Sequence, residues 1–108
     1  MGAETKLQRQ VLDWARAAFP HAFARKIPNG PMYVAGGRKA KSPLAGVPDV
    51  LVVHHGRYIW MEVKVPGEPL SQTQINTHAE MRIAGMEVHL VYSLEDAKQA
   101  MESRGRTS

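Results

Sequence analysis

The spacing of hydrophobic residues changes along the chain from a helical to a strand period. Between Glu4 and Phe19, apolar side chains recur every third or fourth residue, and Pro20 then interrupts the pattern. This spacing places the apolar side chains on one face of a helix, so residues 4–19 are predicted to be helical. Residues 23–27 are partly apolar and predict a brief strand after the helix.

The middle of the chain predicts a β-hairpin. Residues 47–53 are rich in β-branched side chains, and residues 58–65 form a second apolar run. The sequence His-His-Gly-Arg between them has turn character, so the two runs are expected to pair antiparallel. Upstream, residues 28–31 break regular structure, and residues 36–43 predict a mobile basic loop.

The last third of the chain predicts two helices with a strand between them. Ser71 is suited to cap a helix over residues 72–84. Residues 87–92 have strand character, and Ser93 then begins a final helix that runs to about residue 102. The expected order is helix, short strand, hairpin, helix, strand, helix.

Composition limits the chain to one domain. With 108 residues, of which 44% are hydrophobic, the chain can bury one core but not two. Residues 1–108 are therefore interpreted as one domain, with residues 103–108 as a frayed tail. The absence of cysteine excludes disulfides and thiolate zinc sites and favours the cytoplasm. Glu4 and Lys6 argue against a signal peptide or a membrane anchor at the N-terminus.

Basic and acidic residues are unevenly distributed along the chain. Residues 1–45 contain eight Lys or Arg and two Asp or Glu, whereas residues 46–108 contain six and eight. A basic first half suits contact with a polyanion, and the second half can place carboxylates beside it. Uneven charge is also common among small domains that bind no polyanion, so charge alone leaves both interpretations open.

Two acidic residues and a lysine are predicted to meet at one end of the hairpin. Side chains alternate along a strand, so Glu62 and Lys64 point to one face while Val63 points into the core. Asp49 begins the preceding strand, and antiparallel pairing brings its carboxylate beside that of Glu62. A divalent cation with oxygen ligands, Mg²⁺ or Mn²⁺, would keep both carboxylates ionised. A cross-strand ion pair on a solvated sheet face would give the same sequence pattern.

A site of this kind suits the hydrolysis of a phosphodiester. The cation would polarise a phosphoryl oxygen and lower the pKa of a bound water. Lys64 would orient that water or stabilise the charge that develops in the transition state.

The sequence around these three groups resembles a known nuclease family. Five segments carry the resemblance: Lys26–Gly30 (KIPNG), Gly46–Asp49 (GVPD), Glu62–Lys64 (EVK), Pro66–Gly67 and Leu70–Gln74 (LSQTQ). Together they resemble the VRR-NUC branch (virus-type replication-repair nucleases) of the PD-(D/E)XK nuclease superfamily, over about residues 4–101. The acid and lysine pattern alone recurs by chance, but the five segments in this order are specific.

The resemblance implies a fold and a set of reaction-centre residues. The fold is α/β, the restriction-endonuclease-like αβββαβ core, in which helices flank a mixed sheet. Asp49, Glu62 and the backbone carbonyl of Val63 would bind the metal, and Lys64 would be the catalytic lysine. Val65 departs from the family pattern, because a glycine or a basic residue often follows that lysine.

Two further residues match family positions. Glu4 would help to hold the metal or its water shell, and Gln74 would touch a metal-bound water or a phosphate. A favourable charge at a helix N-terminus would also explain Glu4, and Gln74 would be ordinary in the first turn of a surface helix. His78, four residues after Gln74 on the same helical face, could approach the site, but it is predicted to be a boundary residue.

The resemblance also implies a substrate and partners. A chain that consists of this domain alone resembles the members found in bacteriophages and other viruses. Those members tend to be homodimers that act on branched DNA such as four-way (Holliday) junctions. A viral protein of this kind would act in the host cytoplasm. Phosphate contacts are expected from the basic loop and its base, namely Lys26, Asn29, Arg38, Lys39 and Lys41. The hypothesis is thus a metal-dependent endodeoxyribonuclease. The first alternative is a non-catalytic DNA-binding module of the same fold, and the second is a basic scaffold protein in a replication or packaging complex.

Overall fold

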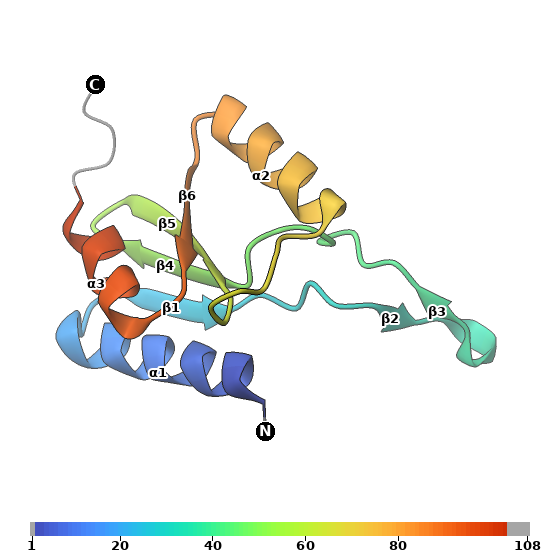
Figure 1. Cartoon of the computed structure of the whole chain (residues 1–108), viewed down its shortest axis with the longest axis horizontal. Coiled ribbons are helices and arrows are strands. Elements are labelled where there is room, and N and C mark those ends of the chain that lie inside the picture. The colour runs from blue at the N-terminus through green and yellow to red at the C-terminus, as the bar shows by residue number, and fades with distance from the viewer. Residues whose placement is uncertain (1, 104–108) are drawn as a thin grey trace.

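A mixed β-sheet with helices on both faces forms the body of the protein (Figure 1). The computed structural model describes residues 2–103, and within this range the main sheet has four strands in the order β1-β4-β5-β6. The strands are β1 (Phe23–Lys26), β4 (Val50–His54), β5 (Arg57–Val63) and β6 (Glu87–Val91). The helices are α1 (Ala3–Ala18), α2 (Gln72–Ile83) and α3 (Leu94–Glu102). Strands β1, β4 and β5 are antiparallel neighbours, whereas β6 is parallel to β5.

The order of the main elements follows the predicted αβββαβ core, with α3 added at its end. The hairpin of β4 and β5 forms as predicted, but β4 begins at Val50 rather than Val47. Pro48 has no amide hydrogen to contribute to a ladder, and the amide of Val47 instead donates to the carbonyl of Leu44 in a turn, 3.0 Å away. The segment before β4 is therefore a turn that delivers Asp49 to the start of the strand.

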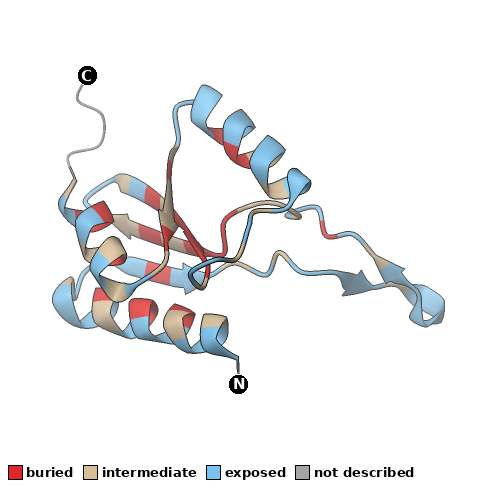
Figure 2. Cartoon of the chain, in the orientation of Figure 1, coloured by how far each residue is buried: buried red, intermediate tan, exposed pale blue. Residues whose placement is uncertain are grey.

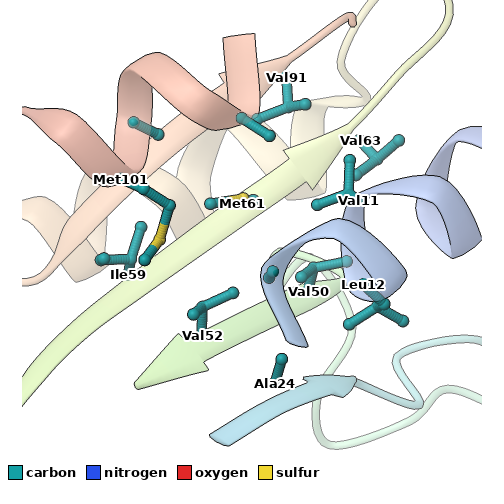
Figure 3. Packing of buried hydrophobic residues seen from close by; sticks show 13 residues of the cluster. Val11, Leu12, Ala24, Val50, Val52, Ile59, Met61, Val63, Val91 and Met101 are labelled. Atoms are coloured by element: carbon teal, nitrogen blue, oxygen red, sulfur yellow. The ribbon is translucent and has the colours of Figure 1, made fainter. Parts of the chain in front are cut away.

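The hydrophobic core lies between one face of the sheet and helices α1 and α3 (Figure 3). The helices contribute Val11, Leu12, Ala15, Ala97, Ala100 and Met101, and the strands contribute Ala24, Val50, Val52, Ile59, Met61, Val63 and Val91. Burying a Val, Leu, Ile or Met side chain contributes about 1.5–3 kcal/mol, so this cluster is the main source of stability. Because Met61 and Val63 face this core, Glu62 between them faces the other side of the sheet.

Helix α2 packs on that other side, close to the end of β5. Ser71 caps it as predicted, in a capping box with Gln74. Most of α2 is exposed, and its buried residues are His78 and Met81 (Figure 2). The helix approaches the turn before β4 closely at Gly46, where an added Cβ would lie 2.8 Å from the carbonyl oxygen of Thr73. Only glycine fits this contact, so Gly46 lets α2 dock against the sheet.

The segment predicted to be a mobile loop contains a small hairpin that projects from the body (Figure 1). Strands β2 (Met32–Tyr33) and β3 (Lys39–Ala40) pair antiparallel in a sheet of their own, joined by a 3-10 turn at Ala35–Gly37. The prediction of a loop was wrong here, because two-residue strands are too short to give an alternating pattern. We call residues 31–42 the arm.

The chain end is described only as far as Ser103, whose amide donates to the carbonyl of Gln99, 2.9 Å away, at the end of α3. The rest of the predicted tail, residues 104–108, lies outside the described residues. Within residues 2–103, no helix is both long enough and apolar enough to cross a membrane.

Candidate active site

Asp49 and Glu62 lie beside each other where β4 begins and β5 ends. The register pairs Val50 with Met61, and its continuation places Asp49 opposite Glu62. Both carboxylates are buried, with exposed fractions of 4% for Asp49 and 2% for Glu62. The sequence predicted this pairing, and the structure brings the two acids together at one end of the sheet.

Asp49 is held by hydrogen bonds from β5 and from α1. The amide of Val63 donates to its Oδ1 at 2.9 Å, and the side-chain amide of Gln8 donates to its Oδ2. Burial raises the pKa of Asp49, whereas these two hydrogen bonds lower it because they stabilise the ionised form. The carboxylate therefore has a fixed orientation set by two elements.

Glu62 is held by two side chains one turn apart on α2. Gln74 Nε2 donates to Oε2 at 3.2 Å, and His78 Nε2 lies 3.2 Å from Oε1. Burial, followed by the nearby charge of Asp49, raises the pKa of Glu62 to about 8. Burial also lowers the pKa of His78, which favours a neutral imidazole. A neutral His78 ring on α2 therefore supplies no positive charge to balance the Glu62 carboxylate.

Lys64 continues directly from β5 and is buried beside the two acids. Its amide donates to the carbonyl of Val91 at 3.0 Å, and its Nζ lies 3.8 Å from Oε2 of Glu68. The positive charge of Lys64 lowers the pKa of both Asp49 and Glu62, although burial outweighs it at each of them. The three groups predicted to converge thus act on one another electrostatically.

The two carboxylates open into a cleft of about 600 Å³ between α1, the start of α2 and the segment after β1. The cleft is lined by Glu4, Thr5, Gln8, Lys26, Ile27, Pro28, Asn29, Gly30, Asp49, Glu62 and Gln74. Four of the residues singled out in the sequence, Glu4, Lys26, Asn29 and Gln74, therefore surround the acids. The other three residues predicted to contact phosphates, Arg38, Lys39 and Lys41, lie on the arm and do not line this cleft.

Comparison with known proteins identifies the fold. A solved structure described as "VRR_NUC domain" superposes on the chain with a TM-score of 0.67 and 23% sequence identity, covering 94% of this chain and 96% of that one. The chain has the fold of a VRR_NUC domain. The VRR_NUC resemblance predicted from the five sequence segments is thus confirmed for the fold. A scan against protein-family models finds no match, and a search of the curated proteins finds no significant one.

Within this VRR_NUC fold, two polar residues that contact the acids were not assigned to the site from the sequence. Gln8 is buried and contacts Asp49; it lies four residues after Glu4, so helical spacing could have placed both on one face of α1. His78 was predicted to be a boundary residue, and that prediction was wrong because its side chain is 1% exposed and contacts Glu62. Its spacing of four residues from Gln74 had indicated the alternative, an approach to the site, and both side chains contact Glu62.

The donor set suits a hard divalent cation. Among residues 2–103, no three His, Cys, Asp or Glu side chains come together as a group that could hold a metal ion, so the candidate side-chain ligands are limited to the pair Asp49 and Glu62. Mg²⁺ is commonly bound through one or two carboxylates and keeps several waters. Two buried carboxylates whose pKa values are raised by burial gain most from a cation between them. The residues present therefore fit such an ion.

Proposed function

We propose that this protein is a Mg²⁺- or Mn²⁺-dependent deoxyribonuclease that hydrolyses phosphodiester bonds. The observation that carries the proposal is the buried pair of Asp49 and Glu62, which lines a cleft and whose pKa values are raised by burial and lowered in part by the positive charge of Lys64. Burying two carboxylates together costs several kcal/mol unless a positive charge compensates them. The VRR_NUC fold and the basic first half of the chain support the same conclusion.

In this proposal, Asp49, Glu62 and the backbone carbonyl of Val63 hold the cation. Glu4 and Gln74 hold its water shell from the two sides of the cleft, in keeping with their places in the lining. When bound, the cation supplies Lewis-acid catalysis at the phosphoryl group and an activated water. All of these ligands are oxygen donors, as a hard cation requires.

The remaining residues of the site position these ligands and stabilise charge. Lys64, with its ammonium group held in a buried site, stabilises the negative charge that develops on the phosphate. Gln8 fixes Asp49, and Gln74 and His78 fix the two oxygens of Glu62. Lys26 and Asn29 at the cleft wall contact the DNA backbone on its way to the metal.

We further propose that the enzyme is a homodimer that cuts branched DNA such as four-way junctions internally. Two nicks on opposing strands need two sites related by a two-fold axis, which a symmetric dimer supplies. Light scattering of the purified protein, alone and with a junction, tests the dimer independently of cleavage. A monomer in both states would remove this part of the proposal and leave the chemistry in place.

The cleavage assay compares a labelled four-way junction, a flap and a plain duplex in the presence of Mn²⁺. Wild type is expected to cut the junction fastest, and Lys64→Ala is expected to lose at least about a hundredfold in rate, as is typical for the loss of a group that stabilises transition-state charge. Lys98→Ala on α3 is the matched control and should cut normally. Binding without products in wild type would instead support the non-catalytic DNA-binding module.

A further inference from the structure

The arm is an ordered ribbon rather than a loose loop. At its tip the amide of Val34 donates to the carbonyl of Arg38 at 2.8 Å, and the amide of Gly37 donates to the carbonyl of Val34 at 3.0 Å. Gly36 and Gly37 have φ values of 85° and 75°, a backbone conformation that is strained for residues with a side chain. The chain therefore turns tightly and returns as a paired strand.

The base of the arm is joined to the candidate active site by hydrogen bonds. The side chain of Asn29, in the segment before the arm, donates to the carbonyl of Val47 in the segment after it. The amide of Ile27 donates to the carbonyl of Asp49 at 2.8 Å. A molecule held along the arm is thus held at a fixed place relative to the carboxylates.

The arm lies within a segment that has no acidic residue. From Trp14 to Pro48 the chain contains six Lys or Arg and no Asp or Glu. Three of the six, Arg38, Lys39 and Lys41, belong to the arm, and all three are exposed. A projecting surface with this positive charge attracts a polyanion along the whole length of the arm.

The arm also exposes apolar side chains that its own fold does not cover. Tyr33 is 71% exposed and Met32 is 44% exposed. Tyr33 pairs with Lys39 across the two strands, so an aromatic ring and an ammonium group share one face of the ribbon. Such a face can contact both the sugars or bases and the phosphates of a nucleic acid.

We propose that the arm lies in a groove of duplex DNA on one side of the bond that is cut. This inference rests on the proposed nuclease function and assigns it a substrate feature, a double-stranded flank. A two-stranded β-ribbon fits the major groove, whereas a single strand has no groove to receive it. The stretch from Gly30 to Ala35 reaches roughly 17 Å at about 3.3 Å per residue, which corresponds to about half a turn of duplex.

The first test removes the arm by replacing Met32–Lys41 with two glycines. No residue of the arm belongs to the described core, so the variant is expected to fold, as its melting temperature will show. Fluorescence anisotropy with a labelled 20-base-pair duplex and with the corresponding single strand, in Ca²⁺ to prevent cleavage, measures binding. We expect the affinity for the duplex to fall at least about tenfold and the affinity for the single strand to change little. The dependence of duplex affinity on salt concentration should also become shallower, by up to about three released ions, because the arm carries three basic residues.

The second test keeps the ribbon and changes one charge. Lys39→Glu should weaken duplex binding severalfold, whereas Lys98→Glu on α3, at the other end of the body, should not (Figure 1). Equal effects of these two substitutions, or unchanged duplex affinity without the arm, would overturn the inference. If removal of the arm also alters the oligomeric state, the arm could contact a second copy of the protein instead of DNA. Weaker duplex binding by Lys39→Glu than by Lys98→Glu would then show that the arm contacts DNA.

The outcomes separate this inference from the proposed function. If wild type cleaves DNA and both arm variants bind the duplex as wild type does, the role of the arm is refuted and the nuclease proposal is not. Duplex binding through the arm without any cleavage would refute the nuclease proposal alone. No duplex binding by wild type would refute both.

Discussion

The Nε2 atom of His78 lies 3.2 Å from Oε1 of Glu62, and both side chains are almost completely buried. Helix α2, which packs on the face of the sheet that Glu62 occupies, thus fixes the carboxylate at the end of β5. The contact places Glu62 between α2 and Asp49, so the two acids have fixed positions before any ligand arrives. His78 is therefore a positioning residue for the proposed metal ligand.

Replacing His78 with leucine should weaken metal binding more than it weakens the fold. Loss of a residue that orients a metal ligand typically lowers affinity about 10- to 100-fold. We expect Mn²⁺ affinity, measured by calorimetry, to fall in that range for His78→Leu and to recover partly in His78→Gln, which restores a donor. Equal Mn²⁺ affinity in wild type and His78→Leu would show that His78 only fills space.

The stability of the metal-free protein should depend on pH through Glu62. Its pKa is about 8 in the folded state, against an ordinary value of 4.5, so the folded protein keeps a proton that the unfolded chain has lost. The resulting stabilisation is complete below about pH 4.5 and is lost as the pH rises to about 8. At most it amounts to about 5 kcal/mol, since one pH unit corresponds to about 1.4 kcal/mol.

Glu62→Gln removes this titration and serves as the test. In EDTA, thermal or urea unfolding should show the variant more stable than wild type at pH 8.5, with a much smaller difference at pH 5. Mn²⁺ should restore the stability of wild type at the higher pH, because it binds the ionised form, and should have little effect on the variant. Parallel pH profiles for the two proteins in EDTA would contradict the raised pKa of Glu62.

Gly46→Ala should destabilise the protein more than Gly85→Ala does. Both glycines have positive φ, 86° and 95°, so alanine costs about 1–2 kcal/mol at each from the backbone alone. A Cβ at Gly46 would also collide with Thr77 and with the carbonyl of Thr73, whereas a Cβ at Gly85 meets nothing within 4 Å. We expect Gly46→Ala to cost about 1–3 kcal/mol more in urea unfolding. Similar losses at both positions would show that α2 does not pack tightly there.

Local patterns in the sequence predicted most of the body of the fold. The helix expected over residues 4–19 is α1, and the β-branched run followed by a turn is the hairpin of β4 and β5. The pairing of Asp49 with Glu62 follows from that hairpin alone, because antiparallel register and side-chain alternation are local rules. The proximity of the two acids could therefore be predicted from the sequence, whereas their burial could not.

What the sequence did not predict depends on long-range packing. Helix α2 exposes the apolar Ile75 and Ile83 and buries the polar His78, so its hydrophobic pattern does not indicate the face that meets the sheet. The packing of α2 on the body, with its close approach at Gly46, brings His78 to Glu62. The arm was missed for a different reason, since each of its strands has two residues and its turn depends on the conformation of Gly36 and Gly37.

We propose above all that Asp49 and Glu62 together bind a divalent cation. Isothermal titration of Mn²⁺ into wild type, Asp49→Asn and the control Asp13→Asn, an exposed acid on α1, tests it most directly. We predict one Mn²⁺ bound by wild type and by Asp13→Asn, and none detectable in Asp49→Asn at the same concentrations. No binding by wild type, or binding that Asp49→Asn leaves unchanged, would contradict it.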